Sequence, residues 1–249
     1  MPELSRERVL ITGGGSGFGL ALARLLLASG NEVLIAGRNS ERLRTAAEAS
    51  PGLHYWAADV TNSEDRARLL NAAEQRLGGV SLLVNNAAVQ TPIELVAEPP
   101  LAVVHATHRE FEADLLAPIA LTIEALPLLR SQPASIVAFV TSTLAFAPKR
   151  STPAYNSAKA GLNTFATSLR YQLQADAPHV RSALITLPLV DTPMTAGRGR
   201  GKIEATDAAR RALRKLAAGR DNIRVGGANA FHLLHRIAPG AAESITRNA

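Results

Sequence analysis

The chain enters its first strand–turn–helix unit with Val9-Leu10-Ile11-Thr12-Gly13-Gly14-Gly15-Ser16-Gly17-Phe18-Gly19, and the apolar stretch 20–27 follows directly. A buried strand, a glycine turn and an apolar helix in this order form the context required of a dinucleotide-binding fingerprint. Glycine tolerates positive φ and lets the backbone approach a pyrophosphate, which binds at the helix N-terminus. The alternative is a glycine turn that binds nothing. The sequence predicts cofactor contacts at Gly13, Gly15, Ser16, Gly17, Phe18 and Gly19.

The rest of the chain alternates short apolar strands with apolar-faced helices. Strands are expected at 9–12, 33–36, 53–58, 82–85, 136–142 and 180–187, and further helices at 63–76, 109–129, 155–173 and 205–218. Strands separated by helical crossovers imply a parallel sheet covered on both faces. The predicted fold class is α/β: one Rossmann-type, doubly wound parallel sheet of about seven strands.

The length of 249 residues suits one large domain with a buried core, so a single dinucleotide-binding catalytic domain is expected over residues 1–249. Glycines alternate with basic and polar residues at 195–202. This composition predicts the hinge of a small substrate lid over residues 194–218.

The end of the expected second strand indicates which dinucleotide binds. Residues 33–36 run into Gly37-Arg38-Asn39, whereas an NAD site usually carries an acid there for the ribose 2′-hydroxyl. A small residue followed by the guanidinium of Arg38 suits a 2′-phosphate, which it can bind through charge-assisted hydrogen bonds. We therefore predict NADP(H), with NAD(H) less favoured. The alternative is a solvated Arg38 that opens the next helix.

A second group of residues indicates proton chemistry. Tyr155 and Lys159 lie one helical turn apart in Tyr155-Asn156-Ser157-Ala158-Lys159, which places the phenol and the ammonium on one helix face. A neighbouring ammonium lowers the pKa of a phenol and makes proton exchange feasible. The hydroxyl of Ser142, at the end of an expected strand, could orient a substrate carbonyl. These three residues are the predicted catalytic set.

Composition excludes several other classes of protein. With 47% apolar and 19% charged residues, and no apolar run of the ~18 residues that span a bilayer, the chain is expected to be cytoplasmic, without a membrane partner. The chain has no cysteine, which excludes disulfides and thiolate metal sites. His105 and His108 with Glu112, or His232 with His235, do not complete a ligand set, so no metal is predicted.

Charge is concentrated at the C-terminal end. Residues 195–249 hold eleven Lys and Arg against four Asp and Glu, a net charge of +7. Arg210 and Arg214, with Arg211 and Lys215, would form a basic stripe on one helix. A nucleic-acid surface over 198–224 is one explanation, and a solvated helix is the favoured one because neither interleaved aromatic residues nor a known motif accompanies the charge. No nucleic-acid partner is therefore predicted.

Together, these motifs resemble the short-chain dehydrogenase/reductase family over residues 7–194. The matching features are Thr12-Gly13-x-x-x-Gly17-x-Gly19, Asp59-Val60, Asn85-Asn86-Ala87-Ala88, the Ser142, Tyr155 and Lys159 set, and Pro188-x-x-x-Thr192. Three further phrases are most similar to the branch labelled DltE-like: Gly37-Arg38-Asn39, Gln90-x-Pro92-Ile93 and Leu144-Ala145-Phe146-x-Pro148.

The resemblance implies hydride transfer between a nicotinamide cofactor and a carbonyl or alcohol. Tyr155 would be the general acid in reduction and the base in oxidation. Lys159 would lower the pKa of Tyr155 and hold the nicotinamide ribose, while Ser142 would polarise the substrate carbonyl. Tyr155 and Lys159 are also expected to contact the cofactor. The other cofactor contacts that the resemblance implies are Asp59, Val60, Asn86, Ala87, Pro188, Val190 and Thr192.

Two positions depart from the family pattern. Members usually carry an Asn in the long fourth helix, where it completes a proton relay through water. The matching residue here is Asp114, which joins Ser142, Tyr155 and Lys159 in the predicted catalytic set. A carboxylate loses the amide donors and adds a charge, so we expect turnover that is slower or shifted in pH. Ala88 replaces a common Gly, which tightens packing near the cofactor.

Three functions are open from the sequence. The first is an NADP(H)-dependent carbonyl reductase or alcohol dehydrogenase, the second a catalytically weak or inactive NADP(H)-binding sensor or interaction protein, and the third a nucleic-acid binder. The substrate is expected to be a small carbonyl or alcohol, and the resemblance implies a homodimer or homotetramer. Apolar Leu144, Phe146 and Met194 and cationic Lys149, Arg150 and Arg198 are expected around the substrate.

Overall fold

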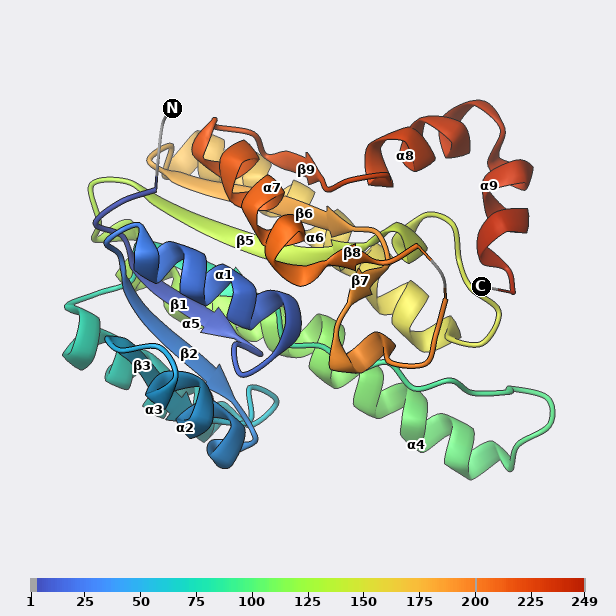
Figure 1. Ribbon diagram of the computed structural model, residues 1–249, viewed down its shortest axis with the longest axis horizontal. Helices are drawn as coiled ribbons and strands as arrows, with labels where there is room; N and C mark the ends of the chain where they lie inside the picture. The colour runs from blue at the N-terminus through green and yellow to red at the C-terminus, as the bar shows by residue number, and fades with distance from the viewer. Residues whose placement is uncertain (1–3, 200, 249) are drawn as a thin grey trace.

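The computed structural model describes residues 4–199 and 201–248, and its centre is a seven-stranded parallel sheet. The strands between the two edges of the sheet are short and largely apolar, typical of sheets buried on both faces. The strands lie in the order β3 (Leu53–Ala57), β2 (Glu32–Gly37), β1 (Arg8–Thr12), β4 (Leu82–Asn85), β5 (Ser135–Ser142), β6 (Val180–Leu187) and β9 (Asn222–Arg224) (Figure 1).

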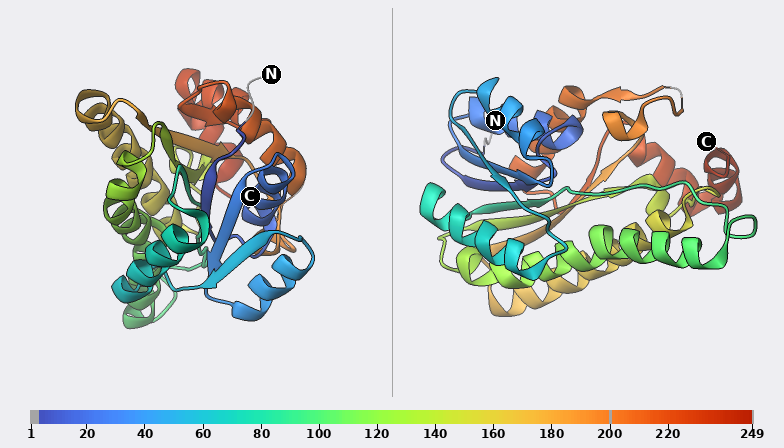
Figure 2. Two further views of the ribbon diagram at one scale, coloured as in Figure 1. Left: turned by 90° about the vertical axis from the view of Figure 1, so that its left-hand side faces the viewer. Right: turned by 90° about the horizontal axis from the view of Figure 1, so that it is seen from below.

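Helices cover both faces of this sheet (Figure 2). One face carries α1 (Gly17–Ala28), α2 (Ser40–Glu48) and α7 (Ala205–Ala217), and the other carries α3 (Ser63–Leu77), α5 (Ala117–Arg130) and α6 (Pro153–Asp176). Side chains of β1 alternate between the two cores, with Val9 and Ile11 in one and Leu10 in the other. The predicted doubly wound α/β fold is confirmed.

The chain reverses direction across the sheet between β1 and β4. It first winds outward from β1 to β2 and β3, then returns to β4 and winds the other way. In open parallel sheets, ligands bind outside the carboxyl ends of the strands at such a switch point. The loops that follow β1, β4, β5 and β6 therefore gather at one edge.

The long helix that borders this edge differs from the prediction. Helix was expected over 109–129, but α4 (Pro100–Phe111) begins earlier and passes through a π-helical turn (Glu112–Leu116) into α5. Pro118 explains the turn, because it has no N–H to donate to the carbonyl of Asp114 and its ring crowds that carbonyl. The widened turn accommodates this and sets the orientation of Asp114.

The expected lid divides into two parts. Its first part starts within the short helix η3 (Pro193–Thr195) and ends with β8 (Ile203–Glu204), which pairs with β7 (Val190–Asp191), a strand that precedes the expected lid. Its second part is α7, which packs beside α1 and buries Ala208, Ala212 and Leu216 in the core. Helix α7 therefore belongs to the main fold, and the substrate lid over residues 194–218 stays a prediction.

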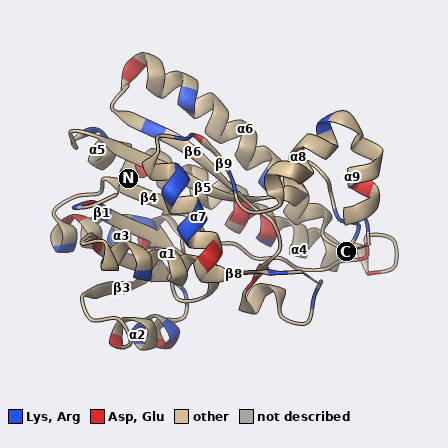
Figure 3. Cartoon of the chain, turned by 45° about the horizontal axis from the view of Figure 1, so that its top comes forward, with Lys and Arg blue, Asp and Glu red and all other residues tan. Residues whose placement is uncertain are grey.

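The basic stripe lies on the outward face of α7 (Figure 3). Arg210, Arg211, Arg214 and Lys215 are exposed, and Arg211 is 2.8 Å from the carboxylate of Asp207. The chain ends in α8 (Ala228–Ile237) and α9 (Pro239–Thr246), which stand beside the β5–α6 connection (Figure 1). Within the described residues, no helix combines the length and apolar character needed to cross a membrane.

Candidate active site

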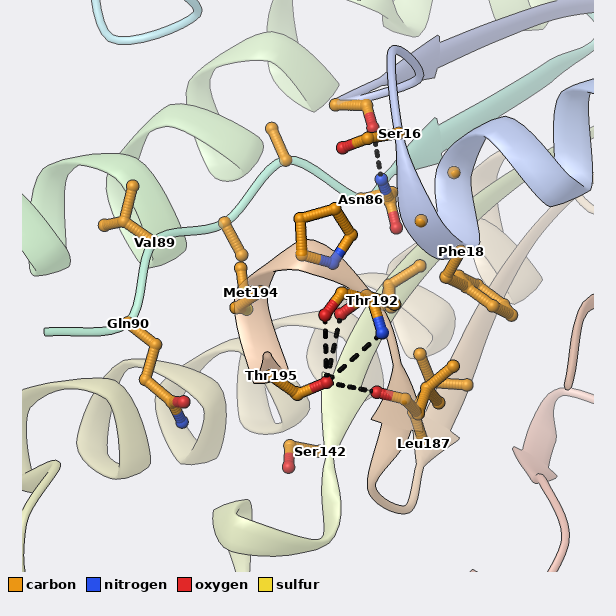
Figure 4. Close-up of a pocket in the computed structure, with 18 of the residues that line it drawn as sticks. Ser16, Phe18, Asn86, Val89, Gln90, Ser142, Leu187, Thr192, Met194 and Thr195 are labelled. Carbon is orange, nitrogen blue, oxygen red and sulfur yellow. Dashed lines mark hydrogen bonds between the residues drawn. The ribbon is translucent and has the colours of Figure 1, made fainter. Parts of the chain in front are cut away.

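A cleft of about 480 Å³ lies at the carboxyl edge of the sheet (Figure 4). All but one of the predicted site residues line it, although they come from loops far apart in the sequence. They are Gly13, Gly15, Ser16, Gly17, Phe18, Gly19, Arg38, Asp59, Val60, Asn86, Ala87, Ser142, Tyr155, Lys159, Pro188, Val190 and Thr192. The exception is Asp114, which lies behind the cleft wall.

The glycine turn is held against the loop that follows β4. Gly13 has φ +65°, and a Cβ there would lie 2.8 Å from the Cα of Ala87. The side-chain amide of Asn86 donates to the carbonyl oxygens of Thr12 (2.9 Å) and Gly13 (3.1 Å). The buried hydroxyl of Thr12 accepts hydrogen bonds from the backbone N–H groups of Asn86 and Ala87, both at 3.0 Å. Strand β1 and the β4 loop therefore form one rigid wall.

The turn leads directly into the N-terminus of α1, whose first residues line the cleft. Gly17 also has positive φ, and a Cβ there would lie 3.0 Å from the side chain of Thr192. Glycine is therefore required at both positions by conformation and by close approach. A glycine-lined surface at a helix N-terminus fits the pyrophosphate of a dinucleotide.

Two guanidinium groups stand at the β2 end of the cleft. Arg38 and Arg42 are exposed and line it, and Arg42 packs beside Gly15. Within residues 4–199 and 201–248, neither has a carboxylate at ion-pair distance, whereas Arg44 on the same helix pairs with Glu41 and Glu48. Sequence reasoning missed Arg42, which lies in the first turn of α2, four residues after Arg38.

At the other end of the cleft, β5 and α6 bring the predicted catalytic residues together. Ser142 ends β5, and its hydroxyl accepts a hydrogen bond from the N–H of Leu144 at 3.1 Å. Tyr155 and Lys159 lie one turn apart on α6, with the Lys159 ammonium 5.5 Å from the centre of the Tyr155 ring. Both side chains are buried in the wall of the cleft.

Asp114 is completely buried behind Lys159. One carboxylate oxygen, Oδ1, accepts a hydrogen bond from the N–H of Val89 at 2.8 Å. The other, Oδ2, lies 3.4 Å from the Lys159 ammonium, at ion-pair distance but outside hydrogen-bond geometry. Burial raises the pKa of Asp114, and the charge of Lys159 opposes that rise. The charge of Lys159 is therefore shared with a carboxylate inside the protein.

The environment of Tyr155 differs from the one expected. Burial raises the pKa of Tyr155 above its usual range, the Asp114 carboxylate raises it further, and the Ser142 hydroxyl and Arg198 act in the opposite direction. The expectation that Lys159 lowers this pKa stays a prediction; the Lys159 ammonium lies 3.4 Å from Oδ2 of Asp114 and 5.5 Å from the centre of the Tyr155 ring. In this arrangement the phenol is held as the neutral acid.

A second buried carboxylate lies one turn before Asp114. Glu110 accepts a hydrogen bond from the N–H of Thr91 at 2.6 Å, and burial raises its pKa. It also contributes to the raised pKa of Tyr155. Sequence reasoning missed Glu110, since nothing in its local pattern distinguishes a buried acid from a solvated one.

Some of the side chains expected around the substrate line the cleft, and others lie outside it. Leu144, Met194, Lys149 and Arg198 line the cleft. Phe146 does not; it packs against Phe231 and His232, with ring centres 5.9 and 5.1 Å away. Arg150 pairs with Glu94 outside the cleft. Nowhere in the described parts of the chain do three His, Asp or Glu side chains gather as a metal site would require.

A doubly wound sheet with a glycine turn at its switch point is the architecture of Rossmann-type nucleotide-binding proteins. A family model described as short chain dehydrogenase matches residues 7–202. The chain belongs to the short-chain dehydrogenase/reductase family. It is 36% identical over 190 residues to "Uncharacterized oxidoreductase DltE" of Bacillus subtilis, covering 76% of this chain and 74% of that protein. The predicted DltE-like branch is confirmed.

Other proteins share the fold or part of the sequence. An uncharacterized oxidoreductase of Staphylococcus aureus is 28% identical over 221 residues, covering 87% of this chain and 93% of that protein. Among solved structures, a short chain dehydrogenase from Burkholderia cenocepacia in complex with NADP has a TM-score of 0.84 at 22% identity, covering 99% of this chain and 100% of that one. A 3-ketoacyl-(acyl-carrier-protein) reductase from Brucella melitensis complexed with NADH has a TM-score of 0.80 at 22% identity, covering 90% and 98%.

Proposed function

We propose that the protein is an NADP(H)-dependent dehydrogenase/reductase that transfers a hydride between the cofactor and a small carbonyl or alcohol substrate. The observation that carries the proposal is the meeting of Ser142, Tyr155 and Lys159 in the same cleft as the glycine turn. The hydride would come from, or return to, the nicotinamide of the bound cofactor.

The chain's own residues would manage the proton and the position of the substrate. The Tyr155 hydroxyl gives its proton to the carbonyl oxygen in reduction and recovers it from the alcohol in oxidation. The Ser142 hydroxyl donates a hydrogen bond to the same oxygen and orients it. Lys159, with Asp114 behind it, supplies a fixed positive charge beside the phenol. Pro188, Val190 and Thr192 form the wall where the nicotinamide would lie.

The preference for NADP(H) rests on charge at the β2 end. Arg38 and Arg42 supply two guanidinium groups at the position where an acid would serve NAD(H). Structural relatives bind NADH in one case and NADP in another, so the side chains of this chain carry the choice. Asp59 and Val60 line the neighbouring wall, where the adenine would pack.

Thermal unfolding with NADPH and NADH titrated separately tests this proposal. A ligand at ~100 times its dissociation constant stabilises the folded state by about 2.7 kcal/mol. We expect NADPH to give the larger rise in Tm and Arg38→Ala to remove most of the difference. A larger rise with NADH would contradict the cofactor assignment, and no rise with either would contradict dinucleotide binding.

A catalytically weak NADP(H) sensor is the second candidate. The observation that favours it is the buried Asp114, whose carboxylate lies at ion-pair distance from the Lys159 ammonium and raises the pKa of Tyr155. Both functions predict cofactor binding, so they are separated by turnover. Saturable NADPH oxidation with any of a panel of aldehydes and ketones favours the enzyme, while tight binding without turnover favours the sensor.

The remaining predictions concern the surroundings of the protein. A homodimer or homotetramer and a cytoplasmic location are inferred from the family resemblance and the composition. A small-molecule substrate is favoured over nucleic acid, because the cleft holds the chemistry-bearing residues and the basic face of α7 is partly paired with Asp207.

A further inference from the structure

Two cations line the substrate end of the cleft. Lys149 follows β5 and Arg198 follows η3, and both side chains are only partly exposed. Burial lowers the pKa of Lys149, and the charge of Arg198 lowers it further. Arg198 also lowers the pKa of Tyr155. The positive charge of Arg198 therefore acts on both Lys149 and the phenol.

Within residues 4–199 and 201–248, neither cation is paired with a carboxylate, although neighbouring cations are. Arg150, next to Lys149, lies 2.9 Å from the Glu94 carboxylate, and Lys202, in the same loop as Arg198, lies 3.2 Å from Asp191. Over the parts of the chain that the structure describes, no carboxylate lies at ion-pair distance from Lys149 or Arg198. Partly desolvated like charges left without an anion are unfavourable, and a bound anion would relieve this cost.

The backbone that carries Lys149 and the side chain of Arg198 are held in place by hydrogen bonds. The carbonyl oxygen of Lys149 accepts a hydrogen bond from the Asn156 side chain at 2.7 Å. The carbonyl of Pro148 accepts one from the Thr246 hydroxyl at 3.3 Å, which ties this loop to α9. Arg198 donates to the Gln90 side chain at 2.8 Å, across the cleft from its own loop. The loops that present the two charges are therefore anchored before a substrate arrives.

The cofactor's phosphates have their own partners elsewhere. The glycine turn follows β1 and Arg38 follows β2, whereas Lys149 follows β5, and β1 and β4 separate β2 from β5 in the sheet. An anion at Lys149 and Arg198 would thus lie on the Ser142 and Tyr155 side of the cleft. This is the side on which the substrate must bind for Tyr155 to reach its oxygen.

We propose that Lys149 and Arg198 bind an anionic group, a carboxylate or a phosphate, on the carbonyl or alcohol substrate of this cleft. The inference rests on the proposed function, because it describes the substrate of the same site. The anionic group takes no part in the reaction: the hydride adds to the carbonyl carbon, the Tyr155 proton goes to the oxygen, and the anion only fixes the substrate. Leu144 and Met194 would contact the carbon skeleton between the two ends.

Matched pairs of charged and neutral carbonyl compounds test the proposal. The first pair is 4-carboxybenzaldehyde and its methyl ester, and the second is dihydroxyacetone phosphate and dihydroxyacetone, each with NADPH. We expect kcat/KM to be about tenfold or more higher for the anionic member of at least one pair, as a charge-assisted hydrogen bond provides. The pair that shows the preference distinguishes carboxylate from phosphate.

Variants assign the preference to these side chains. Lys149→Met should remove about tenfold of the anionic preference and leave the neutral compound within about twofold, while Lys149→Arg should retain most of it. Arg150→Gln is the matched control, since it removes the same charge from the adjacent residue outside the cleft. Equal kcat/KM for charged and neutral members of both pairs, or an equal loss on both in Lys149→Met, would overturn the proposal.

A binding measurement separates this inference from the proposed reaction. Protein loaded with NADP⁺ is unfolded thermally with 4-(hydroxymethyl)benzoate or its methyl ester. A rise in Tm with the carboxylate but not with the ester, lost in Lys149→Met, supports the anion site. If the same protein reduces no aldehyde, the absence of turnover counts against the proposed enzyme and not against the anion site. The opposite result is an equal rise in Tm with both compounds, or with neither, in protein that reduces both aldehydes equally. That result counts against the anion site and leaves the proposed enzyme in place.

Discussion

The charged side chains at the two ends of the cleft differ in exposure and in how strongly they interact with one another. At the β2 end, Arg38 and Arg42 are exposed, and within the described residues they have no acidic partner. At the α6 end, Tyr155, Lys159 and Asp114 are buried and in contact, and the charge of one side chain is altered by the next. Water screens the first pair and is excluded from the second group.

This difference decides what can be expected of a single substitution. An exposed guanidinium acts on its ligand nearly independently, so its loss should subtract one interaction from binding. A buried charge affects the protonation of its neighbours, so its loss changes their chemistry as well. The β2 end should therefore respond in affinity and the α6 end in rate and in pH dependence.

The largest effect is expected from Tyr155→Phe. This change removes the only atom of the side chain that can donate a proton, and positioned general acids contribute about 10²–10⁴-fold to rate. We expect kcat to fall by that factor while the dissociation constant for NADPH changes by less than about twofold, measured by steady-state kinetics and fluorescence titration. A parallel loss of NADPH affinity would show that the two ends are not independent.

A smaller effect is expected at the β2 end, from Arg42→Ala. Losing one charge-assisted hydrogen bond to a phosphate should weaken NADPH about tenfold to a hundredfold and leave NADH unchanged. Isothermal titration with each cofactor measures both. Arg44→Ala is the control, because it removes a guanidinium from the same helix that is already paired with Glu41 and Glu48. An equal loss for NADPH and NADH would assign Arg42 a structural role.

Much of the fold could be predicted because its strands are buried on both faces. The apolar runs at 33–36 and 180–187 correspond to β2 and β6 within two residues at each end. Strand β9 was missed because it is only three residues long, Asn222–Arg224. The start of α4 was missed because its apolar side chains, Leu101 among them, face outward rather than toward the core.

The site residues were predictable where a short stretch of sequence is enough to indicate their role. The glycine turn and Arg38 follow their strands directly in the sequence, so a local pattern was enough. Glu110 and Asp114 depend on tertiary structure. The carboxylate of Glu110, in α4, is buried beside the loop at Thr91, and that of Asp114, in the π-helical turn, is buried between Lys159 of α6 and the loop at Val89. No local sequence pattern predicts that the Lys159 ammonium lies at ion-pair distance from the Asp114 carboxylate as well as beside the Tyr155 ring.

The smallest effect, and the most direct test of coupling at the α6 end, is the pH dependence of Asp114→Asn. The Asp114 carboxylate raises the pKa of Tyr155, so the neutral amide should lower it. Alcohol oxidation requires the phenolate, and its rate should therefore rise at a lower pH in the variant, by about one unit or less. The shift is partial because the Glu110 carboxylate remains near the phenol and still raises the pKa of Tyr155.

Glu112→Gln is the control, since it removes an exposed carboxylate from the same π-helical turn and should leave the pH–rate profile unchanged. An unchanged profile in Asp114→Asn would mean that Asp114 is already protonated, or that Lys159 balances its charge, and the contrast between the two ends would then be one of burial alone.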